Sequence, residues 1–193
     1  MVTNGNDSGA GSLRAAIEDP DTTSIKIDIK GNGIINIDSS LLYAGVGPLT
    51  ITGDDNGKRP TIKASGDFDL LQTQSDLTVE NVDFQGPGGF SINSRSAEDI
   101  PGKGIYVDIP DDATGVIKVE LKDVKVSDVA NHGVHISDCD TETCGNGNTG
   151  NGVGSAASVE VVLENVVVSN VGQGKFDGDG VRVDERGDGK IVK

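Results

Sequence analysis

Three copies of one eight-residue phrase decide the fold: Leu77-Thr-Val-Glu-Asn-Val-Asp-Phe84, Val119-Glu-Leu-Lys-Asp-Val-Lys-Val126 and Val161-Val-Leu-Glu-Asn-Val-Val-Val168. The same place in each copy is held by an Asn or Asp, and these residues follow one another at a constant spacing of 42 residues: Asn81, Asp123 and Asn165. Self-similarity at a fixed period of this size indicates a stacked repeat, in which each unit packs on the one before it.

Each copy predicts two strands joined at a corner. Apolar and polar residues alternate, which is typical of a strand with one buried face, and the phase shifts at the Asn or Asp. Asn and Asp suit a corner because they tolerate the left-handed backbone region. A third strand, introduced by a glycine, follows each copy: Gly104-Ile-Tyr-Val107, Gly133-Val-His-Ile136 and Gly180-Val-Arg-Val183. No helix fits between the strands, so equivalent residues should stack in columns, with strands about 4.8 Å apart.

This pattern resembles the repeat of right-handed parallel β-helix proteins, a pectate-lyase-like superfold. The superfamily includes pectate lyases, polygalacturonases, phage tailspikes and many bacterial surface proteins. The resemblance covers residues 25–193 and is specific for the fold, whereas one fold hosts many activities. Less regular strands between residues 25 and 73 add two turns, so we expect an all-β solenoid of about five turns. Residues 86–103 and 138–157 are predicted to be insertions outside the coil.

Residues 1–24 are predicted to be an N-terminal capping segment ahead of a parallel β-helix in residues 25–193. The segment Ser12-Leu-Arg-Ala-Ala-Ile17 is similar to the opening of many bacterial β-helix surface proteins. Ser12 is a good N-cap, and the apolar residues after it share one helical face. A short helix here would cover a sheet edge and apolar core at the end of the coil.

The last residues, Gly189-Lys-Ile-Val-Lys193, look like the first strand of another turn. We therefore expect the coil to continue beyond the end of this chain. An uncapped turn exposes unpaired backbone groups, which recruit a further strand from any available partner. Self-association through this C-terminal turn is the expected behaviour of the isolated chain.

Composition argues against several classes of function. Aromatic residues make up 3% of the 193 residues and Trp is absent, which argues against an aromatic platform for nucleic acid. The net charge of −15 repels nucleic acid and anionic membranes, although it attracts divalent cations. No apolar run approaches the roughly 18 residues of a membrane-spanning helix.

Two cysteines, Cys139 and Cys144, lie close together in the second predicted insertion. They do not make a zinc site by themselves, because two further ligands would be needed. The fold resemblance implies an extracellular or cell-surface location, where disulfides persist, and therefore a bond between these two residues. A pair of reduced thiols in a cytosolic protein is the alternative.

The third strands carry the candidate carbohydrate-binding residues. Alternation from the glycine sends Tyr106, His135 and Arg182 outward in one column, with Asp108 and Asp184 in the next column. In polysaccharide-acting members of the resembled superfamily the substrate groove runs along an outer face, so the resemblance implies a sugar-binding strip here. Acid–base or metal-assisted lyase chemistry would use such residues. An ordinary polar outer face fits them too, and no lyase or polygalacturonase signature is present.

The densest acidic cluster is a candidate metal site and comprises Asp177, Asp179, Asp184 and Glu185. Calcium takes about six to eight oxygen ligands, often from Asp in tight Gly-rich turns. The EF-hand pattern fails at Val181, however, and a turn built from Asp and Gly explains the same residues.

The sequence thus favours a non-enzymatic extracellular or cell-surface module with a structural or adhesive role. Such a module requires no cofactor, and calcium is its one candidate ion. Two alternatives stay open: a polysaccharide lyase or glycoside hydrolase that acts on an outer β-helix face, and a calcium-dependent carbohydrate-binding module. The expected partner is a glycan or another surface protein, without nucleic acid and without membrane insertion.

Overall fold

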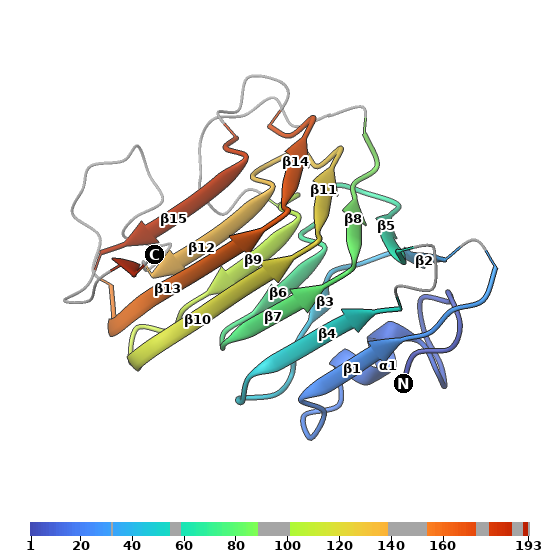
Figure 1. Ribbon diagram of the computed structural model, residues 1–193, viewed down its shortest axis with the longest axis horizontal. Helices are drawn as coiled ribbons and strands as arrows, with labels where there is room; N and C mark the ends of the chain where they lie inside the picture. Colours follow the sequence, from blue (N-terminus) through green and yellow to red (C-terminus); the bar gives the residue numbers. More distant parts are fainter. Residues whose placement is uncertain are drawn as a thin grey trace.

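The protein is a parallel coil of short strands, seen in a computed structural model (Figure 1). The structure describes residues 1–31, 33–54, 59–88, 101–138, 154–172, 178–186 and 191–192. The elements in chain order are α1 (Leu13–Ile17), β1 (Ser24–Ile27), β2 (Ile34–Ile37), β3 (Leu41–Leu42), β4 (Leu49–Gly53), β5 (Thr61–Ala64), β6 (Leu71–Thr73), β7 (Leu77–Glu80), β8 (Asp83–Gln85), β9 (Ile105–Asp108), β10 (Thr114–Lys122), β11 (Lys125–Ser127), β12 (Val134–Asp138), β13 (Ala156–Glu164), β14 (Val167–Ser169), β15 (Val181–Glu185) and β16 (Ile191–Val192).

Each turn of the coil contributes one strand to each of three parallel sheets. Sheet A has the order β1-β4-β7-β10-β13-β16, sheet B the order β14-β11-β8-β5-β2, and sheet C the order β15-β12-β9-β6-β3. Strands of successive turns therefore lie side by side, as Figure 1 shows for β1, β4, β7, β10 and β13. The predicted fold class, an all-β parallel β-helix of about five turns with a short N-terminal helix, is confirmed.

The predicted register is confirmed, but one column is not buried along its whole length. Leu121 pairs with Val79 on one side and with Leu163 on the other. Val79 and Leu121 are fully buried, whereas Leu163 is 42% exposed, so the expectation that all three would be buried is wrong for Leu163. The reason is that β16 pairs with β13 only at Val159 and Glu160, which leaves Leu163 uncovered by the described strands.

The corners between sheets A and B adopt the left-handed conformation that the Asn and Asp residues predicted. Asn81, Asp123 and Asn165 have φ angles of 57°, 52° and 53°. The Asn165 side-chain amide donates to Asp123 Oδ1 at 3.2 Å, so the corners also bond from turn to turn. A second corner repeats this arrangement at Asp128 and Asn170, with φ angles of 60° and 55°. The Asn170 amide donates to Asp128 Oδ1, and this second ladder was not predicted.

Glycines fix the start of the strands in sheet C because the turns approach too closely for a side chain. A Cβ atom on Gly104 would lie 2.5 Å from the carbonyl oxygen of Gly133. One on Gly133 would lie 2.6 Å from the carbonyl oxygen of Gly180. The same carbonyls accept hydrogen bonds at 3.0 Å from Ile105 and Val134, so the close approach belongs to the pairing itself.

The short helix α1 covers the first turn, next to β1 and β3. The Ser12 side chain accepts a hydrogen bond from the Ala15 N–H at 3.2 Å, which confirms Ser12 as the N-cap. Leu13 and Ile17 are fully buried in the core. Within the described residues no helix is long and apolar enough to cross a membrane.

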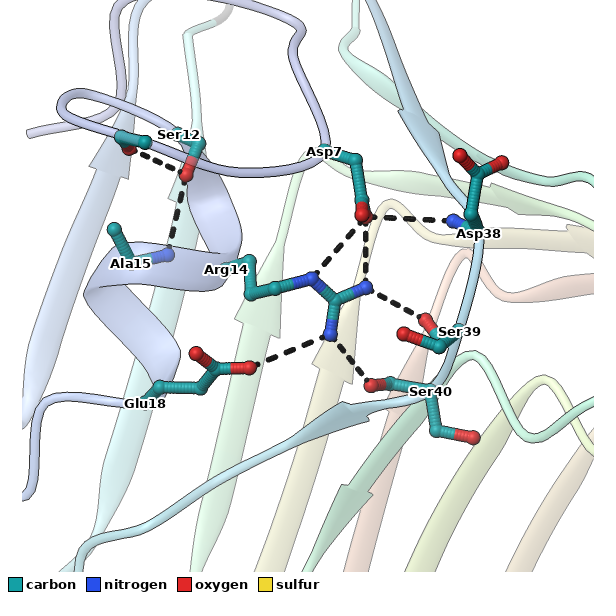
Figure 2. A network of polar contacts seen from close by, with 9 residues as sticks. Asp7, Ser12, Arg14, Ala15, Glu18, Asp38, Ser39 and Ser40 are labelled. Carbon is teal, nitrogen blue, oxygen red and sulfur yellow. Dashed lines mark hydrogen bonds and ion pairs between the residues drawn. The ribbon is translucent and has the colours of Figure 1, made fainter.

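Arg14 joins this helix to the loop between β2 and β3 (Figure 2). Its guanidinium donates to Asp7 Oδ1 at 2.7 and 3.2 Å, and to the carbonyls of Ser39 and Ser40 at 2.8 and 2.9 Å. Glu18, the C-cap of the same helix, has its Oε1 atom 3.5 Å from Arg14 Nη1. Only 11% of the Arg14 side chain is exposed, so these charge-assisted bonds hold the cap on the coil.

Four local features differ from the sequence-based expectations. Val2 pairs in parallel with Ile27, and the short strand β3 also was not predicted. The predicted insertion 138–157 overlaps the end of β12 and the start of β13, because β13 extends to pair with the whole of β10. In the other predicted insertion, 86–103, the side chain of Lys103 is buried at 2% exposure rather than solvated.

The exposure difference within one column supplies a matched pair of substitutions. We expect Leu121→Ala to lower the free energy of unfolding by about 2–5 kcal/mol, because it removes fully buried methyl groups and leaves a cavity. We expect Leu163→Ala to cost about 1 kcal/mol or less, because this side chain is already half in solvent. Urea unfolding followed by circular dichroism measures both values. Equal losses would contradict the assigned burial.

Candidate functional site

Polar side chains gather in three columns on the outer face of sheet C. Backbone hydrogen bonds place the column that precedes the strands, since the N–H groups of Leu70, Gly104 and Gly133 donate to the carbonyls of Lys103, His132 and Asp179. The sheet C cluster is defined as these three columns: Asp69, Lys103, His132 and Asp179; Gln72, Tyr106, His135 and Arg182; Asp108, Ser137 and Asp184.

The centre of the sheet C cluster is buried although it points away from the interior of the coil. Tyr106 is 5% exposed, and His135 is 2% exposed. His132 is fully buried. The rim of the sheet C cluster is more exposed, since the side chains of Arg182 and Asp184 are 20% and 15% exposed. Electrostatic interactions in such a site are stronger than on an open surface, because less water screens them.

The aromatic rings of the cluster pack on one another. The Tyr106 and His135 rings stack with centroids 5.3 Å apart and an interplanar angle of 23°. His132 meets His135 edge-on, with centroids 4.9 Å apart. The Lys103 ammonium lies 4.5 Å from the centroid of the Tyr106 ring, within the range of a cation–π interaction. These contacts hold His135 in one orientation.

Asp184 is held ionised by two cationic or hydrogen-bonding neighbours. Burial by itself raises the pKa of Asp184, but hydrogen bonds from His135 and Arg182 outweigh it and lower this pKa to about 2. His135 Nε2 lies 2.9 Å from Asp184 Oδ2, and Arg182 Nε lies 2.6 Å from the same oxygen. Because an ionised carboxylate only accepts hydrogen bonds, His135 carries its proton on Nε2. Among the described residues the buried His135 Nδ1 has no hydrogen-bond partner.

The pKa of Asp108 is shifted in the opposite direction to that of Asp184. Burial raises its pKa, against the hydrogen bond from Tyr106 and the positive charge of Lys103. The Tyr106 hydroxyl donates to Asp108 Oδ1 at 3.0 Å, and the Gln72 amide donates to Oδ2 at 3.4 Å. Asp108 and Asp184 lie on β9 and β15 with β12 between them, so their backbones are about 9–10 Å apart. Two carboxyl groups with pKa values pushed apart can serve as an acid and a base.

His132 is kept neutral. Burial lowers its pKa to about 3, and electrostatic interactions with His135, Arg182 and Lys103 act in the same direction. The backbone N–H of Asp179 donates to His132 Nδ1 at 2.8 Å, so this nitrogen carries no proton. The Asp179 carboxylate lies 3.7 Å from the same nitrogen, but a neutral imidazole forms no ion pair with it.

The structure brings together all five predicted carbohydrate-binding residues: Tyr106, His135, Arg182, Asp108 and Asp184. It also adds members that the sequence analysis missed, chiefly Lys103 and His132. A signal for them was present, because each stands directly before a glycine that starts a strand, as Asp179 does before Gly180. The missed signal is thus the residue immediately before the glycine of the repeated third-strand phrase.

The predicted acidic cluster is only partly within the described residues, because Asp177 lies outside them. Asp179, Asp184 and Glu185 are described, and Asp184 is engaged by His135 and Arg182 as above. No group of three or more His, Cys, Asp or Glu side chains arranged to hold a metal ion occurs in the described part of the chain.

A separate groove of about 230 Å³ lies on sheet B. Burial raises the pKa of Asp83 in it, although Arg59 Nε lies 3.4 Å away. Hydrogen bonds from Asn170 and Gln85 lower the pKa of Asp128. The lining mixes carboxylates, hydroxyls, an amide and one ammonium group: Thr61, Asp83, Phe84, Gln85, Lys125, Ser127, Asp128 and Ser169. The sequence analysis did not predict this groove.

Comparison of the chain with family models, with curated proteins and with solved structures finds no match in any of the three. Function must therefore be argued from the geometry of the chain itself. Cys139 and Cys144 lie outside the described residues, so the disulfide between them stays a prediction.

The low pKa of His132 predicts loss of stability in mild acid. The unfolded chain protonates this residue near its ordinary pKa of 6.5, whereas the folded chain does so only near pH 3. Between these values the unfolded state binds more protons, so the free energy of unfolding falls as the pH falls. From pH 6.5 to about pH 4.5 we expect a loss of roughly 2–3 kcal/mol from this residue.

Urea unfolding at several pH values measures this slope, and His132→Asn is the matching variant. Asn can still accept the Asp179 N–H but does not titrate, so its slope between pH 6.5 and about pH 4.5 should be flatter. The carboxylate Asp184 adds loss of the same sign only below its ordinary pKa of 3.8. An unchanged slope in the variant would show that His132 is not the responsible group.

Proposed function

We propose that this chain is a non-enzymatic extracellular or cell-surface module, a β-helix of the pectate-lyase-like type with a structural or adhesive role. The observation that carries the proposal is the closed state of the sheet C cluster. Its ionised and polar groups bond mainly to one another, and its aromatic rings are almost fully buried.

Mutual pairing makes this cluster suited to rigidity rather than to turnover. Asp184 is bonded by His135 and Arg182, and Asp108 by Tyr106 and Gln72. A substrate would have to break several of these bonds before it reached either carboxylate. Fully satisfied polar networks rigidify the structure around them, which favours a load-resistant surface element.

An adhesive role needs polar groups that are still open to a partner. The groove on sheet B offers these, since Lys125 and Ser169 are exposed and Gln85 is half-buried. Its mixture of charges and hydroxyls suits the hydroxyl groups of a glycan or the polar side chains of another surface protein. The partly exposed Arg182 and Asp184 on sheet C provide a second rim for such contacts.

A glycoside hydrolase is the second candidate function, and one observation favours it. The pKa of Asp108 is raised and the pKa of Asp184 is lowered, with the two backbones about 9–10 Å apart. An inverting hydrolase holds its acid and base carboxyl groups about 6.5–9.5 Å apart so that a water fits between base and sugar, and side chains on two strands separated by a third can reach this separation. Asp108 would then be the acid and Asp184 the base.

Assays on a panel of pectins and alginates distinguish these two candidates. Release of reducing sugar and formation of unsaturated uronides are measured with calcium and with a chelator. We expect no activity in either condition, because the carboxylates are engaged within the protein. Activity that is abolished by Asp108→Asn or Asp184→Asn, but kept in the sheet B control Asp83→Asn, would overturn the non-enzymatic proposal.

The extracellular assignment predicts an oxidised cysteine pair. We expect the protein isolated without reductant to have no thiol that reacts with an alkylating agent, and to gain two reactive thiols after reduction. Mass spectrometry after alkylation counts these thiols at Cys139 and Cys144. Two reactive thiols in the unreduced protein would count against both the bond and the secreted location.

A further inference from the structure

Within the sheet C cluster, the fully buried Lys103 forms an ion pair with the partly buried Asp69. The Lys103 side chain is 2% exposed and the Asp69 side chain is 14% exposed. Lys103 Nζ lies 3.6 Å from Asp69 Oδ2, and the backbone N–H of Lys103 donates to Asp69 Oδ1 at 2.7 Å. One residue thus presents both an amine and a hydrogen-bond donor to a single carboxyl group.

The coil holds this pair in place from both sides. Asp69 stands two residues before β6, and Lys103 stands two residues before β9, which is the next strand of sheet C. The Leu70 N–H donates to the Lys103 carbonyl at 2.9 Å, and Leu71 pairs with Ile105. Two reacting groups fixed in this way behave as if at very high local concentration.

The surroundings favour an uncharged product over a buried ion pair. Removing an ammonium and a carboxylate from water costs several kcal/mol per ion, which their attraction only partly offsets. The Lys103 ammonium also lies against the Tyr106 ring. Lys103 is 2% exposed, whereas lysine side chains in proteins are almost never fully buried unless they are paired. An amide between the two side chains carries no charge and removes this cost.

We propose that Lys103 and Asp69 condense to an intramolecular isopeptide bond that joins two successive turns of the coil. The Lys103 Nζ–Cγ bond to Asp69 forms, and the bond between Cγ and Oδ2 breaks. Oδ2 leaves as water with two hydrogens from the ammonium group, so the ion pair supplies every atom and no oxidant or co-reactant is needed. Oδ1 remains as the amide oxygen.

The backbone of Lys103 supports the addition stage of this step. Negative charge develops on Oδ1 when the amine adds, and the Lys103 backbone N–H already donates to that oxygen, as in an oxyanion hole. Asp108 accepts from the Tyr106 hydroxyl beside the Lys103 ammonium. The positive charge of Lys103 acts on Asp108 against the effect of burial, so the two groups interact electrostatically.

Intact mass and peptide mapping of the purified wild-type protein test the bond. We expect a mass about 18 Da below that of the linear sequence, one water, and a branched peptide that contains both Asp69 and Lys103. Lys103→Arg keeps the positive charge but lacks the amine, so it should show the full mass. Asp69→Asn should instead lose ammonia, about 17 Da, because an amide can be the leaving group.

Three outcomes overturn the proposal. The first is a wild-type protein of full mass with separate peptides for the two residues. The second is a water loss that maps to a succinimide at an Asp-Gly step, such as Asp177-Gly178, rather than to a branched peptide. The third is a water loss that persists in Lys103→Arg. The test does not depend on any enzymatic or adhesive activity, so its result is separate from that of the proposed function.

Discussion

Parallel hydrogen bonding between successive turns, in a register that does not slip, is the constraint on which the rest of this structure depends. A slip of one residue would turn every buried side chain of a strand to the outside. The register is fixed at more than one place per turn. The left-handed corner residue Asn165 donates a hydrogen bond to Asp123, the corner residue of the preceding turn. Glycines at the start of the sheet C strands let successive turns approach so closely that a Cβ atom would collide with a backbone carbonyl oxygen. The left-handed corner and the glycine that starts the third strand recur in each of the three regular turns.

A fixed register also determines which side chains become neighbours. Residues at equivalent positions lie one strand spacing apart, about 4.8 Å, so the sequence of one turn faces that of the next. The order Asp69, Lys103, His132, Asp179 therefore places the Lys103 cation beside the Asp69 anion at one end of the column and the neutral His132 imidazole beside Asp179 at the other end. The chemistry of the outer face is thus a consequence of stacking, in the same way as the apolar core.

The two polar regions of the outer face differ in how far they are satisfied. On sheet C the rings of Tyr106 and His135 are buried and Asp184 is bonded twice, so this region resembles a core built from polar groups. On sheet B the groove keeps exposed hydroxyl and ammonium groups. The internally bonded polar region on sheet C and the exposed polar groups on sheet B support the proposed structural or adhesive role.

The sequence by itself determined the period, the corners, the three strands of each regular turn and the helical cap. These depend on local patterns: alternation, an Asn or Asp that tolerates positive φ, a glycine at a close approach and Ser12 as N-cap. It also identified Tyr106, His135 and Arg182 as one outward column, because alternation alone gives the direction of a side chain. Tertiary structure decided what alternation does not specify. Burial of that column, the neutral state of His132 and the pairing of Lys103 with Asp69 all depend on what covers and neighbours each side chain. The hydrogen bonds between His132 and Asp179 and between Lys103 and Asp69 join residues more than 30 positions apart in the chain.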